Sequence, residues 1–177
     1  AAAVYAMHAD PETLRYWSTP PWTETRLADE LIERDLKAMA EGDYVRLGIQ
    51  RSSDGRLIGL CTLFAFYLPS RRCEIGYILA RDCWGHGYMH EALVALLDYG
   101  FAVLDLNRVE ADIDPNNAGS CKTVQRLGFV PRRPQRRSHQ GGRRQRRADQ
   151  VPERTQPLQP LLCRVAGNQR RIDRPDG

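Results

Sequence analysis

The sequence predicts a single α/β domain in which helices pack on a mixed β-sheet. Cys73 to Ala80 is mostly apolar, β-branched or aromatic, which is typical of a buried strand. A glycine-bearing turn and a helical pattern follow directly. A second alternating stretch, Arg108 to Asp114, comes after that helix, and a helix that connects two strands of one sheet joins parallel neighbours. The length of 177 residues fits one domain.

The N-terminal region predicts two helices. Ala1 to His8 has the composition of the end of one helix. Thr23 is expected to cap the next, because Trp22 before it and Leu27 inside it have the spacing of a hydrophobic staple. Gly42 is expected to end this helix. Its buried stripe recurs at three- and four-residue steps and consists of Leu27, Leu31, Ile32, Leu36 and Met39.

Two further strands are predicted before Cys73, at Tyr44 to Arg51 and at Arg56 to Phe66. The Ser-Ser-Asp-Gly stretch between them has the composition of a hairpin turn. Together with Cys73 to Ala80 they should form an antiparallel meander. The helix after the glycine turn begins near Tyr88, and its sheet-facing stripe consists of Leu93, Leu96, Leu97, Phe101 and Leu104.

The turn before this helix contains Gly85 and Gly87. Glycine lets the backbone approach a ligand without Cβ atoms in the way, and the first N–H groups of a helix have no partner within the helix. Such a helix start binds anions, most often phosphate. The Gly-x-Gly spacing alone also fits an ordinary turn, so the choice depends on the rest of the chain.

A short helix is predicted after Asp114. Ser120 follows Asn117 by three residues at its start. Gly128 suits the left-handed position after the helix, and Phe129 suits the hydrophobic contact that comes next. The chain therefore continues as strand, glycine turn, helix, strand and short helix.

In this order, the strand EIGYILA, the turn WGHGY with the HEAL that follows, the strand NRVEADI and the N-x-x-S…LGF helix resemble the acetyl-CoA-binding core of the GNAT acetyltransferases. The RimJ/RimL type, whose best-known members acetylate the N-terminal amine of ribosomal proteins, is the most similar branch. The resemblance covers residues 1–130. It implies a GNAT acyl-CoA N-acyltransferase fold that is incomplete at both ends, because the family has a strand before the first helix and two strands after LGF. The phosphate-loop pattern of the family has Gln or Arg where this chain has Asp82.

The resemblance also implies how acetyl-CoA binds as the acetyl donor. In GNAT proteins the two parallel strands splay apart, and the pantetheine arm pairs with the free strand edge. The acceptor, a protein N-terminus or a small amine, would attack the thioester directly in a ternary complex, and Ser120 would protonate the departing thiolate. The implied cofactor-binding residues are Tyr77, Ile78, Leu79, Trp84, Gly85, His86, Gly87, Tyr88, Asn117 and Ser120.

The base that accepts the amine proton is left open between two carboxylates. Glu74 lies on the central strand and Glu110 on its partner strand, and either could act directly or through a water molecule. A solvated strand carboxylate would explain each of them without catalysis. Ser120 could likewise be an ordinary polar residue of a first helical turn.

No metal site is expected, because His86 and His90 are four residues apart without a third ligand at a suitable spacing. The five cysteines form no C-x-x-C pair, which favours reduced thiols over disulfides or a zinc knuckle. No apolar run reaches the length of a membrane span. We therefore expect a cytoplasmic protein without a membrane partner, as a monomer or homodimer.

Charge is divided unevenly along the chain. Residues 1–130 contain 13 basic and 18 acidic residues, which argues against nucleic acid as a partner of this domain. Residues 131–177 contain 13 Arg and 4 acidic residues but no aromatic residue. This Arg/Pro/Gln-rich tail is predicted to be disordered and without strands, and its abrupt change in composition suggests a shifted reading frame.

Two other functions remain open from the sequence. One is an acyl-CoA-binding remnant without turnover, since the chain lacks pieces of the implied fold. The other is RNA binding through the arginine-rich tail.

Overall fold

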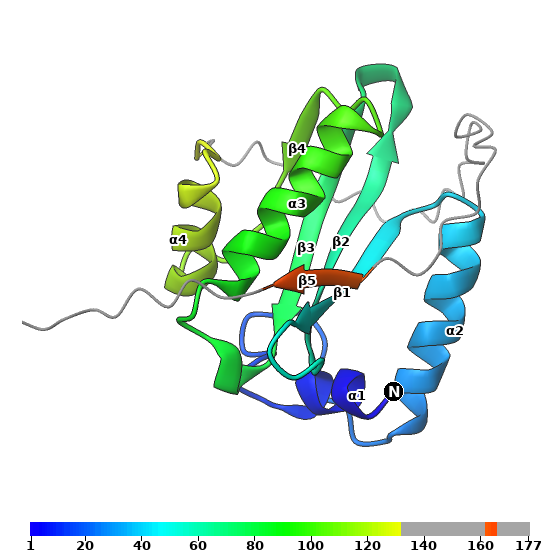
Figure 1. Ribbon diagram of the computed structural model, residues 1–177, viewed down its shortest axis with the longest axis vertical. Coiled ribbons are helices and arrows are strands. Elements are labelled where there is room, and N and C mark those ends of the chain that lie inside the picture. Colours follow the sequence, from blue (N-terminus) through cyan, green and yellow to red (C-terminus); the bar gives the residue numbers. More distant parts are fainter. Residues whose placement is uncertain (132–161, 166–177) are drawn as a thin grey trace, which may run out of the picture.

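The computed structural model describes residues 1–131 and 162–165 (Figure 1). It confirms the predicted mixed α/β class, with five strands in the order β4-β3-β2-β1-β5. The strands are β1 (Val45–Arg51), β2 (Leu57–Tyr67), β3 (Arg72–Leu79), β4 (Arg108–Glu110) and β5 (Leu162–Val165). The helices are α1 (Ala2–Ala9), α2 (Arg26–Ala40), α3 (Tyr88–Ala102) and α4 (Ala118–Arg126), with 3-10 turns η1 (Leu68–Ser70) and η2 (Arg81–Cys83).

The strand directions follow the predicted connections. β1, β2 and β3 form an antiparallel meander, with Leu47 opposite Cys61 and Cys61 opposite Tyr77. β4 pairs with β3 in parallel, because α3 carries the chain back across the sheet before β4 begins. Figure 1 shows α3 lying across the strands that it connects.

Helices cover both faces of the sheet. A Cβ atom added at Gly100 of α3 would lie 3.3 Å from the Leu63 side chain, which places α3 over Leu63. Arg46 of β1, which pairs with Thr62, donates to Asp35 of α2 over 2.7 Å. Since neighbouring residues of a strand point to opposite faces, α3 and α2 lie on opposite sides. The main core is between α3 and the sheet, and its fully buried members include Ile49, Ile58, Leu63, Leu93 and Leu96.

The predicted start of α2 is wrong by two residues. The helix is capped at Thr25 rather than Thr23. The reason lies in Trp22, whose N–H donates to the His8 carbonyl oxygen over 2.9 Å and whose ring stacks on His8 at 4.2 Å. Trp22 is thus held against α1, and the chain needs additional residues before the helix can begin.

Two members of the predicted apolar stripes are exposed. Leu36 of α2 is 55% exposed, because the neighbouring Asp35 turns inward and accepts hydrogen bonds from Tyr44 and Arg46. Phe101 of α3 is 46% exposed, because Gly100 occupies the position facing the sheet. In each helix a partner that is distant in sequence decides which residue faces inward.

The end of α4 agrees with the prediction. Gly128 has a φ of 85°, and its N–H donates to Gln125. The N–H of Phe129 donates to the Val124 carbonyl oxygen over 3.0 Å. These two bonds form a Schellman motif, which closes the helix and returns Phe129 to the core.

The predicted absence of strands after Val130 is wrong for one segment. β5 pairs in parallel with β1, with Gly48 opposite Leu162 and Arg51 opposite Val165. Pairing with an existing strand edge orders these four residues although their sequence has no alternating pattern. The rest of the predicted tail, residues 132–161 and 166–177, lies outside the described residues, and the shifted reading frame stays a prediction. In the described part of the chain, no helix is long and apolar enough to cross a membrane.

Candidate active site

The site begins where β4 leaves β3. Only three residue pairs join the two strands, from Arg72 opposite Arg108 to Glu74 opposite Glu110. β4 was predicted to continue to Asp114 but ends at Glu110, whereas β3 continues to Leu79. From Ile75 onward, β3 therefore has no strand partner on this side among the described residues.

Backbone groups of β3 alternate between β2 and this gap. The Ala80 N–H donates to the Ile58 carbonyl oxygen of β2 over 2.8 Å. Successive residues of an extended strand direct their N–H and C=O groups to opposite sides, so Tyr77 and Leu79 direct theirs into the gap. Ile78 directs its groups to β2, and the structure does not bring its N–H to the gap. The indole Nε1 of Trp84 donates to the Leu79 carbonyl oxygen over 2.9 Å, which leaves two N–H donors there.

The turn from η2 to α3 forms an open backbone cradle. Gly85 and Gly87 have φ values of 79° and 82°, and a Cβ atom added at either would meet nothing within 4 Å. The first helical hydrogen bond of α3 runs from the Glu91 N–H to Gly87, so the N–H groups before it have no partner within the helix. Beside the cradle, the rings of His86 and Tyr88 stack at 5.7 Å.

The first turn of α4 lies against β3. The Asn117 side chain accepts a hydrogen bond from the Ser120 N–H over 3.1 Å and so caps the helix. The Tyr77 hydroxyl donates to the Ser120 carbonyl oxygen over 3.4 Å. Burial raises the pKa of Tyr77, against a smaller lowering by a hydrogen bond with the Ser120 side chain. The structure thus brings Ser120 beside the strand residue whose N–H faces the gap.

The two candidate bases lie on the other face of the sheet, since Glu74 and Tyr77 differ by an odd number of positions. Glu110 accepts hydrogen bonds from Arg72 over 2.7 Å and from Arg108. Glu74 is opposite Phe64 of β2, and Phe64 is 36% exposed. This end of the face is therefore open, and the carboxylates are separated from Ser120 by the sheet.

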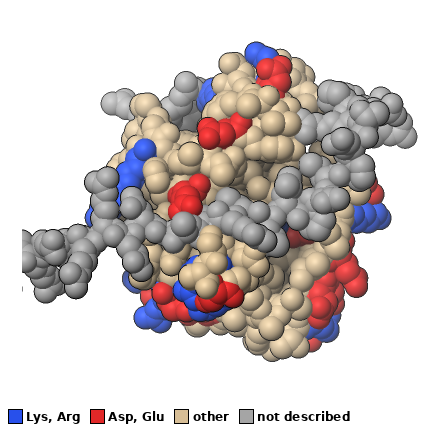
Figure 2. All heavy atoms as spheres, in the orientation of Figure 1, with Lys and Arg blue, Asp and Glu red and all other residues tan. Residues whose placement is uncertain are grey.

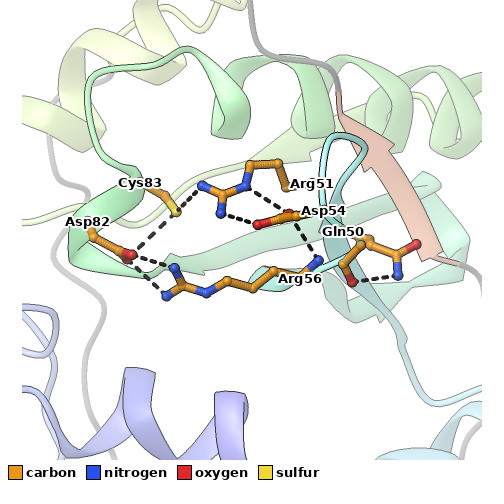
Figure 3. A network of polar contacts seen from close by, with 7 residues as sticks. Gln50, Arg51, Asp54, Arg56, Asp82 and Cys83 are labelled. Carbon is orange, nitrogen blue, oxygen red and sulfur yellow. Dashed lines mark hydrogen bonds and ion pairs between the residues drawn. The ribbon is translucent and has the colours of Figure 1, made fainter.

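Asp82, which departs from the family pattern, is engaged by an arginine of the β1–β2 hairpin. Both terminal nitrogens of Arg56 donate to its carboxylate. Figure 3 shows this pair beside a second one, in which Arg51 binds Asp54 and lies 3.9 Å from the Cys83 sulfur. The hairpin thus contacts the chain immediately before the glycine cradle.

The ion pair of Arg56 with Asp82 and the contact of the Tyr77 hydroxyl with Ser120 could not be predicted from the sequence. Asp82 was the one available signal, because an acid at a position that the family fills with Gln or Arg needs a cationic neighbour. The position of Arg56, 26 residues earlier in the chain, could not be read from the local pattern.

Two further features lie apart from the gap. A cavity of about 720 Å³ lies between α1 and the end of β3, and it contains none of the predicted site residues. It is lined by Ala3, Ala6, Met7, Asp10, Thr13, Arg56, Leu57, Ala80, Arg81 and Asp82. Within the described ranges, no cluster of three His, Cys, Asp or Glu residues could hold a metal ion.

The open edge of β3, the glycine cradle and the capped start of α4 are the features that the resemblance to the GNAT acetyltransferases implies. The model of the acetyltransferase (GNAT) domain family matches residues 1–130, and the chain belongs to this family. The family match and the N-acetyltransferases among its relatives identify the protein as an N-acetyltransferase. The uncharacterized N-acetyltransferase p20 of Bacillus licheniformis is 36% identical over 121 residues, which is 68% of each chain.

Other relatives differ in acceptor. The spermidine N(1)-acetyltransferase of Escherichia coli K12 is 25% identical, over 71% of this chain and 65% of that protein. The solved structure of a putative ribosomal-protein-serine acetyltransferase from Vibrio cholerae has a TM-score of 0.60 and 26% identity, and the match covers 66% of this chain and 66% of that chain. The spermidine N-acetyltransferase of Vibrio cholerae, solved with CoA and spermine, has a TM-score of 0.62, covers 72% of this chain and 73% of that chain, and at 24% identity shows the fold alone.

Proposed function

We propose that this protein transfers the acetyl group of acetyl-CoA to a primary amine by direct attack in a ternary complex. The observation that carries the proposal is the free edge of β3, which lies between the glycine cradle and the first turn of α4. This arrangement supports the proposal, because backbone donors, the start of α3 and the Ser120 hydroxyl would then surround one bound cofactor.

Acetyl-CoA would bind with its diphosphate on the N–H groups at the start of α3 and its pantetheine arm along the free edge of β3. Gly85 and Gly87 leave room for the phosphates, since no side-chain atom fills the space beside them. An amide N–H of the pantetheine arm would donate to the Tyr77 carbonyl oxygen in the way that a neighbouring strand does.

The chemical step needs donors for the oxyanion and a proton for the thiolate. The N–H groups of Tyr77 and Leu79 face the gap and would stabilise the tetrahedral oxyanion. The Ser120 hydroxyl would donate the proton to the departing sulfur. Its position is fixed by the bond from Tyr77 and by the Asn117 cap.

We assign the base to Glu74 rather than Glu110. Both oxygens of Glu110 already accept hydrogen bonds from guanidinium groups. Glu74 lies on the open face, from which an amine would approach the gap opposite the cofactor.

The acceptor that we propose is a cationic amine, either a polyamine or the N-terminus of a basic protein. The domain has an excess of acidic residues. Acidic side chains are prominent in Figure 2 along the edge where α2 lies, and Asp29, Glu30 and Glu33 of α2 are exposed. The names of the relatives mention both acceptor types, spermidine and a ribosomal protein. The acidic charge of the domain supports a cationic acceptor, and experiment must decide between the two types.

A panel of acceptors tests the proposal. Release of CoA is measured with spermidine, with spermine and with a basic peptide that begins with Ser. Replacing Ser120 by Ala should lower turnover about 10²-fold and leave the dissociation constant of CoA unchanged. Thr123→Ala is the matched control, because its hydroxyl donates to the Gly119 carbonyl oxygen one turn further along α4. Binding of CoA without turnover on any amine would instead indicate the acyl-CoA-binding remnant.

A further inference from the structure

An acidic residue, Asp82, lies in the chain shortly before the glycine cradle. Asp82 precedes Gly85 by three residues and lies in the turn that leads into the cradle. A carboxylate near a bound diphosphate would repel it, and solvent would screen part of that repulsion. A family pattern with Gln or Arg at this position does not have this difficulty.

The β1–β2 hairpin supplies the compensating charge. Arg56 binds Asp82 through two nitrogens, and this pair lowers the pKa of Asp82 and raises that of Arg56. Arg51, from the other side of the same hairpin, reaches Cys83 at 3.9 Å. Its bond to Asp54 raises the pKa of Arg51, and an interaction with the Tyr88 hydroxyl adds to this effect. The hairpin therefore contacts Asp82 and Cys83, the two residues of the turn that lead into the cradle (Figure 3).

We propose that Arg56 is a positioning residue for the cofactor, which acts by neutralising Asp82 so that the cradle accepts the diphosphate of acetyl-CoA. The proposal rests on the function given above. Arg56, which lies outside the cradle, would thus supply a positive charge that the family pattern supplies at position 82 where that residue is Arg.

The electrostatic role predicts effects of opposite sign. Arg56→Gln leaves the Asp82 carboxylate without its partner, so the dissociation constant of CoA should rise about three- to tenfold. Asp82→Asn leaves the Arg56 guanidinium available to the phosphates, so the dissociation constant should fall about threefold. The double variant should return close to the unmodified protein. A pair that only held the turn in place would weaken CoA binding in both single variants.

The experiment is isothermal titration of the full chain and each variant with CoA and with pantetheine, at low and high salt. Pantetheine lacks the diphosphate, so its affinity should not change. High salt should reduce the differences for CoA. Arg71→Gln is the matched control, because Arg71 forms an exposed ion pair with Asp105 at the other end of β3 and its loss changes the net charge equally.

The outcomes separate this inference from the proposed function. If the unmodified protein does not bind CoA, the proposed function fails. If it binds CoA and Arg56→Gln leaves the affinity unchanged, or Asp82→Asn weakens binding as Arg56→Gln does, Arg56 has no electrostatic role. A loss of pantetheine affinity equal to that of CoA would also overturn the proposal.

Discussion

Gly87→Ala tests the cradle directly, because the structure provides a control with the same backbone strain. Gly87 and Gly128 have φ values of 82° and 85°, and an added Cβ atom would meet nothing within 4 Å at either position. An L-residue in this left-handed conformation is strained by about 1–2 kcal/mol. The lower entropy of the unfolded chain offsets about 0.4–1 kcal/mol of this. Both variants should therefore lose on the order of 1 kcal/mol of unfolding free energy.

Only the Gly87 variant should lose affinity for CoA. Its methyl group would enter the space where the diphosphate approaches the first N–H groups of α3, and we expect at least a tenfold rise in the dissociation constant, equivalent to about 1.4 kcal/mol. Gly128 closes α4 at the end away from Ser120 and should leave the dissociation constant unchanged.

Urea unfolding measures the stability loss, and titration calorimetry measures the affinity. Equal stability losses combined with an unchanged CoA affinity in Gly87→Ala would refute the assignment of the cradle. Equal affinity losses in both variants would show that backbone strain, and not the position of the methyl group, weakens binding.

Two further predictions concern buried groups. Burial lowers the pKa of His8, so below about pH 6.5 the unfolded chain binds a proton that the folded chain does not. The unfolding free energy should therefore fall by at most about 1.4 kcal/mol per pH unit as the pH decreases below that value. His8→Gln should remove this slope in thermal unfolding measured across pH, and a slope that persists would assign it to other groups. Burial also raises the pKa of Cys73 to about 12, so at pH 8 only about one Cys73 thiol in 10⁴ is ionised. Iodoacetamide should therefore modify the partly exposed Cys121 before Cys73, and peptide mass spectrometry measures the order. Faster modification of Cys73 would contradict the burial of β3.

Local patterns in the sequence were sufficient for most elements of the fold. The glycine turn, α3 and the closure of α4 at Gly128 depend on residues close together in the chain, and each was predicted correctly. Thr23, Leu36 and Phe101 were assigned wrongly because His8, Arg46 and Leu63, which are distant in sequence, determine the local arrangement. β5 was missed for the same reason, since pairing with β1 orders it.

The candidate site likewise has parts that local sequence patterns predict and parts that depend on distant residues. The cradle and Ser120 could be located from motifs, because each motif is contiguous. The gap itself could be expected only from the family resemblance, since it depends on β4 ending at Glu110 while β3 continues. The pairing of Asp82 with Arg56, and the engagement of Glu110 by Arg72, required coordinates, because neither arginine has a fixed spacing from its acid.

The gap-facing groups of β3 have a consequence for how the enzyme tolerates sequence change. The donors at Tyr77 and Leu79 are main-chain amides, which every residue except proline possesses. Substitutions there can change side-chain packing without removing a backbone donor. The residue types at positions 77 and 79 therefore do not indicate whether a related protein keeps these donors. Proline at position 77 or 79 is the one replacement that deletes a donor outright, so proline should be the least tolerated residue at both positions.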